Sequence, residues 1–168
     1  MTESIRVLGI DPGSRITGYG IVELIGGLTR PLAWGSIATE GEHASRLRQI
    51  FDEIGSLVAE HEPDEIAIER VFVHKNAGSA LKLGQARAAA ICATFGRDMP
   101  IHEYAPREIK KALAGSGSAE KSQVEQMVKV VLGLRGLMKP DAADALAVAI
   151  CHIHARRVRQ LIAGAGAA

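Results

Sequence analysis

The hydrophobic pattern of this chain changes its period once, and that change constrains the fold more than any other feature. The first 39 residues predict three strands, at 5–10, 17–25 and 28–39, with Gly26 and Gly27 forming a hairpin turn. After residue 47 the apolar side chains recur at the three- and four-residue spacing of a helix face. Antiparallel strands followed by strands that are reached through helices predict a mixed sheet covered by helices.

The rest of the chain alternates between helices and two short strands. We expect strands at 65–69 and 100–104, and helices at 47–62, 77–95, 106–113, 124–132 and 140–162. This order predicts an α/β protein. In sheets of this kind ligands bind outside the carboxyl ends of the strands, so side chains at those ends are the first candidates for a site.

The length and the cysteines place the chain in a broad class. The 168 residues predict one domain at 1–163, followed by a flexible Gly/Ala tail at 164–168. We find no apolar run of the roughly 18 residues that a membrane span needs, and no signal peptide. Cys92 and Cys151 lie in apolar segments without metal-binding spacing, so we expect two buried thiols and a cytoplasmic location.

The net charge is close to zero, but the charges are unevenly distributed. The formal net charge is +1, a balance that does not by itself suggest a nucleic-acid partner. Residues 1–69 carry a net charge of −7, whereas residues 70–122 carry +5 and residues 123–168 carry +3. The split fits either an uneven solvated surface or an acidic site beside a basic face.

Four carboxylates stand where a metal site can be built. Asp11 and Glu69 end two predicted strands, and both emerge at one edge of the sheet if those strands are parallel neighbours. Asp141 and Asp144 are three residues apart in the first turn of the last helix and share one of its faces. Each position also has an ordinary explanation, such as a turn or a helix dipole. Together they favour an oxygen-ligand site for Mg²⁺ or Mn²⁺.

Two other patterns are weaker indications of a site. Residues 13–20 contain spaced glycines but lead into a strand, unlike known phosphate-binding loops. His152 and His154 are two residues apart on a helix and do not face each other, so we expect a surface or packing role for both.

Basic side chains gather after Glu69 and around the Gly-Ser loop at 115–118, which borders the predicted acidic site. Phe72 lies among them. A loop-borne aromatic residue in such surroundings either stacks on a nucleic-acid base or packs into the core.

Four segments of the chain, in this order, resemble the RuvC family of Holliday-junction resolvases, and the resemblance covers nearly the whole chain. The segments are GIDPGSRITGYG (9–20), AIERVFVHKNAGSALKLGQARA (67–88), GSAEKSQVEQMV (117–128) and DAADALAVAICH (141–152). The resemblance implies a ribonuclease H-like fold, with a five-stranded mixed sheet and helices on both faces. It also implies a homodimer that resolves four-way DNA junctions in recombination and repair, together with a branch-migration complex of the RuvA and RuvB type.

The same resemblance implies roles for individual residues. The implied catalytic and metal-binding carboxylates are Asp11, Glu69, Asp141 and Asp144. They are expected to hold Mg²⁺, with two ions per site and Mn²⁺ as a substitute. Lys110 and Lys121 are implied to assist at the site. The residues expected to contact DNA are Arg70, Phe72, Lys75, Asn76, Lys82, Arg87, Arg107, Lys110, Lys111 and Lys121.

The implied reaction is symmetric nicking of two strands of like polarity, which leaves 5′-phosphate and 3′-hydroxyl ends. The small residues of helix 77–95 make it our candidate dimer interface. Two alternatives are a sugar kinase of the actin-like class and a protein that binds junctions without cutting them. The first needs a second domain for which 168 residues are too few, and the complete set of carboxylates argues against the second.

Overall fold

The computed structural model describes residues 4–71 and 76–165, which contain one five-stranded sheet. The strands are β1 (Ser4–Asp11), β2 (Ile16–Ile25), β3 (Leu28–Ala38), β4 (Glu65–Glu69) and β5 (Ile101–Tyr104). Their order across the sheet is β3-β2-β1-β4-β5. The strands β1, β2 and β3 form antiparallel pairs, whereas β4 pairs in parallel with both β1 and β5. The predicted mixed sheet is confirmed.

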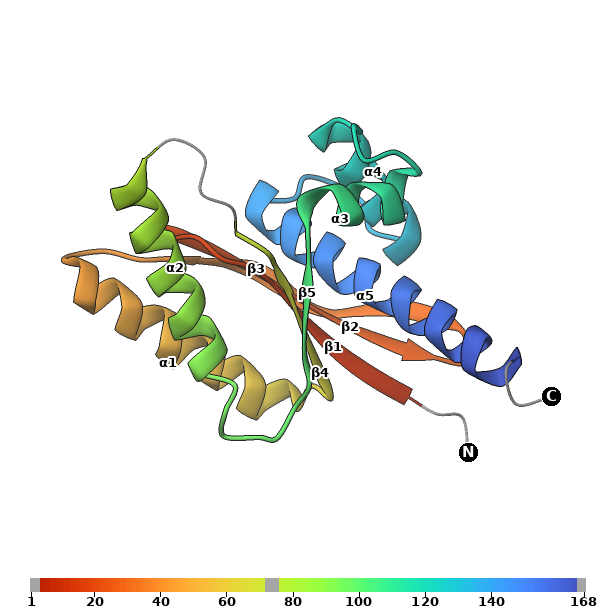
Figure 1. The fold of residues 1–168 in the computed structure, drawn as a ribbon, viewed down its shortest axis with the longest axis horizontal. Helices are drawn as coiled ribbons and strands as arrows, with labels where there is room; N and C mark the ends of the chain where they lie inside the picture. The colour runs from red at the N-terminus through yellow and green to blue at the C-terminus, as the bar shows by residue number, and fades with distance from the viewer. Residues whose placement is uncertain (1–3, 72–75, 166–168) are drawn as a thin grey trace.

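Helices cover both faces of this sheet (Figure 1). They are α1 (His43–His61), α2 (Ala77–Cys92), α3 (Pro106–Ala114), α4 (Lys121–Leu132) and α5 (Pro140–Ala165). The helices α1 and α2 lie on one side, while α5 crosses the other side together with α3 and α4 (Figure 1). The arrangement is the predicted ribonuclease H-like one. Among the described residues, no helix combines the length and apolar character that crossing a membrane requires.

The central strand β1 separates two apolar cores, because successive side chains of a strand point to opposite faces of the sheet. Val7 is buried in the core beneath α5, whereas Leu8 and Ile10 are buried in the core against α1 and α2. Gly9 faces α5, and a Cβ atom there would lie 2.2 Å from the carbonyl oxygen of Ala145. The missing side chain lets α5 lie directly on β1, which brings the start of this helix to the carboxyl end of the strand.

Four helix boundaries differ from the predicted ones by three residues or more, and one of these is the start of α4 at Lys121. The helix α1 begins at His43, before the first residue of the apolar pattern, because its first turn is largely exposed. The helix α2 ends at Cys92, where the hydroxyl of Thr94 donates to a carbonyl of the last turn (2.8 Å). The helix α5 continues to Ala165, so the tail predicted from residue 164 begins inside the helix. Residues 166–168 lie outside the described residues.

The two cysteines do not share one environment. Cys151 is buried in the core, and this burial raises the pKa of its thiol to about 12. Cys92 is exposed at the end of α2, so the prediction of a buried thiol there is wrong. The apolar run around Cys92 belongs to a helix that buries only one of its faces against the sheet, which buries Ala86 and Ala90 but leaves Cys92 outside.

Candidate active site

Two of the four predicted carboxylates meet at the end of the sheet. Asp11 is the last residue of β1 and Glu69 is the last residue of β4. These strands are parallel neighbours with Ile10 opposite Ile68, so the residues that follow emerge at the same edge. Asp11 and Glu69 form a hydrogen bond between their side chains. The condition that the sequence left open, that the two strands are parallel neighbours, is therefore met.

The other two carboxylates lie at the start of α5. Asp141 and Asp144 lie in the first two turns of this helix, which begins at Pro140. Gly18 of β2 pairs with Asp11, and a Cβ atom on Gly18 would lie 2.0 Å from the carbonyl oxygen of Asp141. Because Gly18 has no side chain, the first turn of α5 contacts the sheet beside the end of β1. Three distant parts of the chain thus bring four carboxylates to one edge.

The four carboxylates repel one another. Burial, followed by the charges of Glu69 and Asp144, raises the pKa of Asp11 to about 8. Burial also raises the pKa of Glu69, although its hydrogen bond with Asp11 opposes this shift. A divalent cation supplies the positive charge that keeps such carboxylates ionised, and hard oxygen donors are the ligands that Mg²⁺ prefers. The donor set and the mutual repulsion of its carboxylates therefore fit a hard divalent cation.

Two lysines border the carboxylates. Lys121 begins α4, and its Nζ lies 3.0 Å from Oδ2 of Asp144, a contact that raises the pKa of the lysine. Lys110 of α3 joins Lys121, Asp144 and Glu69 in lining a hollow of about 250 Å³. A second hollow, of about 210 Å³, is lined by Asp11 and Glu69. The lysines therefore place positive charge beside the acidic cluster.

Comparison with known proteins decides the family. The family model described as crossover junction endodeoxyribonuclease RuvC matches residues 7–152. The chain belongs to the RuvC family. The crossover junction endodeoxyribonuclease RuvC of Methylococcus capsulatus is 56% identical over 155 residues, which are 90% of this chain and 92% of the relative. That of Xanthomonas oryzae pv. oryzae is 51% identical over 160 residues, which are 94% of this chain and 92% of the relative.

Solved structures of RuvC proteins share the fold. The structure of Thermus thermophilus RuvC has a TM-score of 0.84 and 32% identity, covering 92% of this chain and 96% of that one. The T. thermophilus RuvC in complex with a Holliday junction substrate has a TM-score of 0.86 and 33% identity, with the same coverage. This RuvC-family chain is a crossover junction endodeoxyribonuclease, and its family uses a divalent metal.

The predicted DNA-contact residues of this RuvC-family chain do not all face the site. Lys82, Arg107 and Lys111 are exposed. Arg87 is mostly buried, and its guanidinium lies 2.6 Å from a carboxylate oxygen of Glu103, so this ion pair connects α2 to β5. Such a contact gives Arg87 a structural role.

The remaining candidates follow β4 in the sequence. Arg70 lines the hollow beside Asp11, and its Nε lies 3.7 Å from Glu103. Asn76 is the N-cap of α2, since its Oδ1 accepts a hydrogen bond from the backbone N–H of Ser79 (3.1 Å). Phe72 and Lys75 lie outside the described residues.

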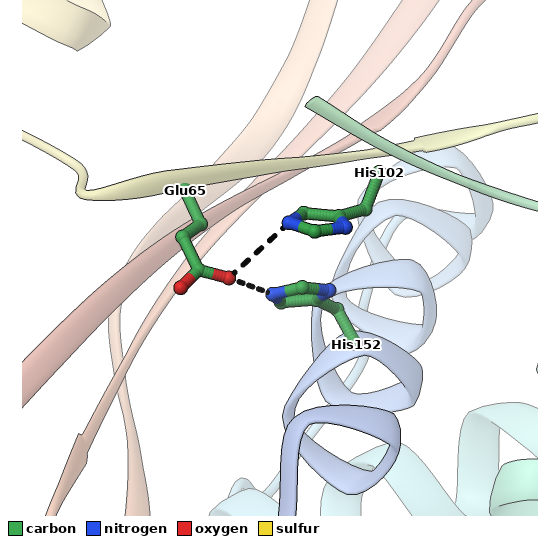
Figure 2. Close-up of side chains that lie close together, drawn as sticks. All are labelled: Glu65, His102 and His152. Carbon is green, nitrogen blue, oxygen red and sulfur yellow. Dashed lines mark hydrogen bonds and ion pairs between the residues drawn. The ribbon is translucent and has the colours of Figure 1, made fainter. Parts of the chain in front are cut away.

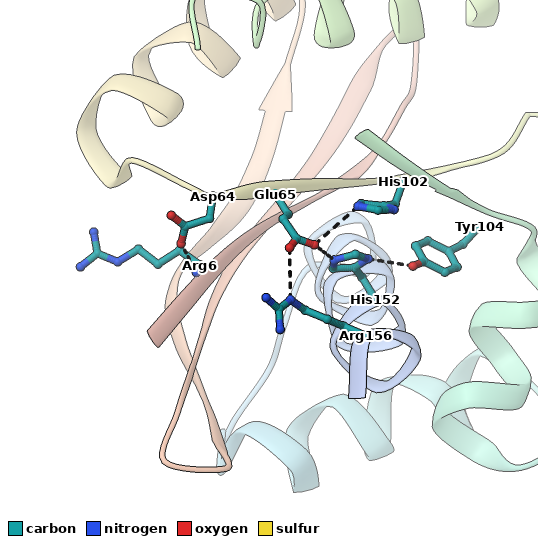
Figure 3. Close-up of polar contacts among 7 residues, drawn as sticks. All are labelled: Arg6, Asp64, Glu65, His102, Tyr104, His152 and Arg156. Carbon is teal, nitrogen blue, oxygen red and sulfur yellow. Dashed lines mark hydrogen bonds and ion pairs between the residues drawn. The ribbon is translucent and has the colours of Figure 1, made fainter. Parts of the chain in front are cut away.

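Sequence reasoning missed a polar network at the other end of β4 (Figure 3). The Oε2 of Glu65 lies 2.5 Å from Nε2 of His152, and its Oε1 accepts a hydrogen bond from Nε of Arg156 (3.1 Å). The hydroxyl of Tyr104 lies 2.7 Å from Nδ1 of His152, which is fully buried. Of the surface or packing role predicted for His152, the burial of the side chain fits packing and excludes the surface. Its partners come from β4 and β5, and no local spacing in the sequence indicates them.

Part of this network offers metal-ligand atoms. Glu65, His102 and His152 present three such atoms within 4.8 Å of one another (Figure 2). Nitrogen and carboxylate donors of this kind suit transition metals. However, Glu65 already pairs with the cationic Arg156, whose charge opposes a second cation. His154 is not part of the group, since its Nδ1 lies 3.2 Å from the carbonyl oxygen of Ala112. The charge of Arg156 therefore makes this group less suited to a cation than its donor atoms alone indicate.

Proposed function

We propose that this chain resolves four-way DNA junctions by hydrolysing two strands of like polarity, one at each site of a homodimer. The observation that supports this most is the convergence of four carboxylates and two lysines at one edge of the sheet. The Holliday junction named as the substrate of the T. thermophilus relative supports the choice of DNA. Recombination and repair are the processes that produce such junctions.

The four carboxylates are proposed to hold Mg²⁺, with two ions per site and Mn²⁺ as a substitute. The proposed ligands are Asp11, Glu69, Asp141 and Asp144. When bound, the metal supplies a water of lowered pKa and positive charge for the departing oxygen. The raised pKa values of Asp11 and Glu69 support this assignment, because the charges of Lys110 and Lys121 only partly offset the effects of burial and of the neighbouring carboxylates.

The side chains around the metal ligands contribute charge and position. We propose that Lys121, held by Asp144, steadies the scissile phosphate, and that Lys110 faces the same phosphate from α3. A phosphodiester gains negative charge as it is attacked, so two fixed ammonium groups stabilise the transition state more than the ground state. Cleavage on the 3′-oxygen side leaves 5′-phosphate and 3′-hydroxyl ends, which a ligase can rejoin.

The exposed face of α2 is the proposed dimer interface. Small and apolar residues line a shallow hollow of about 470 Å³ along this face: Ala77, Ala80, Leu81, Gly84, Gln85 and Ala88. Leu81 is 68% exposed and lies among these small residues, so the face carries a contiguous apolar surface. Ala89, by contrast, packs against the core of its own subunit. Replacement of Leu81 by Glu is therefore the sharper test, and a variant that stays dimeric in sedimentation contradicts the assignment.

The other proposed partner is a branch-migration complex of the RuvA and RuvB type, acting on the same junction in the cytoplasm. The resemblance of the four sequence segments supports it. Co-sedimentation of this chain with such a complex on a four-way junction is the direct test.

Purified protein, Mg²⁺ and a four-way junction labelled in turn on each strand test the proposed reaction. We expect paired nicks at symmetric positions in two opposite strands, rejoined by a ligase. Asp11→Asn is expected to bind the junction but not to cut it, because binding rests on contacts of Lys and Arg with phosphates. Asp52→Asn, which changes an exposed carboxylate of α1, is the matched control and is expected to cut normally. Unpaired nicks, or full cutting by Asp11→Asn, contradict the proposal.

A further inference from the structure

A cavity with a basic lining adjoins the carboxylate edge, and of its lining residues only Lys82 is among those predicted to contact DNA. It has a volume of about 190 Å³ and is lined by Ser14, Arg15, Gly41, His43, Arg46 and Lys82. Three of these residues are cations and none is acidic. Glu42, which lies between two of them in the sequence, is exposed and is not part of the lining. We call this cavity the basic pocket.

The three cations come from three separate elements. Arg15 lies in the turn between β1 and β2, Arg46 lies in the first turn of α1, and Lys82 lies on α2. Among the described residues, none of the three forms an ion pair with a carboxylate. Like charges that converge without acidic partners repel one another, and an anion bound among them removes this repulsion.

Part of the lining is held in place before any ligand binds, namely the side chains of Arg46 and His43 and the backbone at Arg15. The Nε of Arg46 donates to the carbonyl oxygen of Gly41 (2.8 Å), which leaves the two terminal nitrogens of its guanidinium for other partners. The carbonyl oxygen of Arg15 accepts a hydrogen bond from the backbone N–H of Thr39 (2.9 Å), so the turn is tied to the segment that leads into α1. His43 and Gln85 connect α1 to α2 through a contact of 2.7 Å. A preformed site loses less entropy when it binds.

The basic pocket and the catalytic hollow lie next to each other. The hollow beside Asp11 is lined by Pro12 and Leu83, while the pocket is lined by Ser14 and Lys82. The same turn and the same helix therefore border both. An extended chain that places one of its groups at the carboxylates passes along this turn toward the pocket.

We infer that the basic pocket binds a backbone phosphate of the DNA strand that is being cut, next to the phosphate at the carboxylates. The inference rests on the proposed function. Cavities that hold drug-sized ligands have volumes of about 300–1,000 Å³, so this pocket is too small for a whole nucleotide and suits a single phosphate group. By fixing a second phosphate, the pocket sets the register of the strand over the carboxylates.

Arg46→Gln and Arg15→Gln test the pocket, and Arg48→Gln is the matched control. Arg48 lies on the same helix as Arg46, but it is exposed and pairs with Asp52. We expect each pocket variant to bind the junction about tenfold more weakly and to lower the slope of log affinity against log salt by about 1. We expect Arg48→Gln to change the affinity less than about twofold. Because Arg15 is exposed, its variant keeps the test valid if Arg46→Gln unfolds.

Neutral methylphosphonate groups placed one at a time near the cut position locate the phosphate. We expect one position at which the methylphosphonate weakens binding by the wild-type protein but does not further weaken binding by Arg46→Gln. This result is expected if Arg46 and that phosphate contact each other. Equal affinities of Arg46→Gln and Arg48→Gln for the junction overturn the inference. So does a loss of affinity on replacing Arg46 that is the same with and without a methylphosphonate at every position. If one of these two results is obtained and the wild-type protein still cuts the junction, only the assignment of the pocket is contradicted. If the wild-type protein does not cut, the proposed function is lost as well.

Discussion

The two ends of β4 carry glutamates in opposite electrostatic states. At the carboxyl end, Glu69 lies beside Asp11, and burial raises the pKa of both carboxyl groups. At the other end, burial acts on Glu65 in the same direction, but hydrogen bonds from His152 and Arg156 outweigh it and hold its pKa below the usual value. Two glutamates four positions apart on one strand therefore differ. The surroundings of Glu69 disfavour its charged form, whereas the partners of Glu65 stabilise its charged form.

This difference separates a site that needs a ligand from a network that holds the fold together. The network around Glu65 joins β4, β5 and α5 by contacts whose charges cancel (Figure 3). The cluster around Glu69 has four carboxylates beside two lysines, and a bound cation would offset the negative charge that the lysines leave. Proteins commonly keep such strain where function requires it and give up stability in return.

Replacing the glutamate at each end of β4 by glutamine is expected to give the largest difference between the two ends. We expect Glu69→Gln to slow junction cutting about a thousandfold, because loss of a metal ligand removes several kcal/mol of transition-state stabilisation and each 1.4 kcal/mol is a factor of ten. Glu65→Gln is expected to cut at the wild-type rate when it is folded. Single-turnover cleavage of a labelled junction measures both. Similar rates for the two variants contradict the division of roles.

The stability of the metal-free protein is expected to change in opposite directions at the two ends. Glu65→Gln leaves Arg156 and His152 without their carboxylate, which we expect to lower the free energy of unfolding by about 2–3 kcal/mol. Asp11→Asn removes a repelling charge, which we expect to raise it by about 1–2 kcal/mol at pH 8. Urea denaturation in the presence of a chelator measures both changes. A destabilised Asp11→Asn protein argues that the carboxylates are not under strain.

The two ends also predict opposite dependences on pH. The folded-state pKa of Asp11 is raised, so its contribution to stability is present below pH 4 and is lost as the pH rises toward 8. The folded-state pKa of His152 is lowered to about 4, chiefly by burial, so its contribution is present above pH 6.5 and is lost as the pH falls toward 4. Each slope is at most about 1.4 kcal/mol per pH unit.

Denaturation curves across this range separate the two contributions. We expect Mg²⁺ to abolish the loss of stability of the wild-type protein between pH 6.5 and 8. In Asp11→Asn, we expect stability to rise with pH between 4 and 6.5, and further replacement of His152 by Phe to flatten that rise. If Mg²⁺ does not change the loss of stability between pH 6.5 and 8, a group other than Asp11 causes that loss.

The smallest effect is expected from Zn²⁺ at the network end. Because Arg156 already neutralises Glu65, we expect His102→Phe to bind Zn²⁺ as the wild type does, as measured by calorimetry on the Glu69→Gln background. We also expect this variant to change stability by less than about 0.5 kcal/mol, since His102 is partly exposed and lies 3.5 Å from Glu65. Zn²⁺ binding that disappears in His102→Phe makes the network a metal site and removes the contrast between the ends.

Much of the fold was predictable because local pattern and fold agree. The change from strand to helix periodicity, the hairpin glycines and the strand-ending position of Asp11 all depend on neighbours in the sequence. The prediction failed for Cys92, where an apolar run indicated burial although its helix has one open face. It also missed the length of α5, since an Ala-rich helix extends by adding one hydrogen bond per residue without any need for burial.

The sequence by itself determined which strands and helices form, the positions of the four carboxylates on them, and the family motifs. Only the tertiary structure decided which of these groups meet. Gly9 and Gly18 let α5 approach β1, and that approach places Asp141 and Asp144 beside Asp11. Packing between segments distant in the chain sets the surroundings of Glu65 and Glu69. It also brings together the residues that line the basic pocket. Local propensity acts over a few residues, whereas the charge that surrounds a buried group is set by every element packed against it.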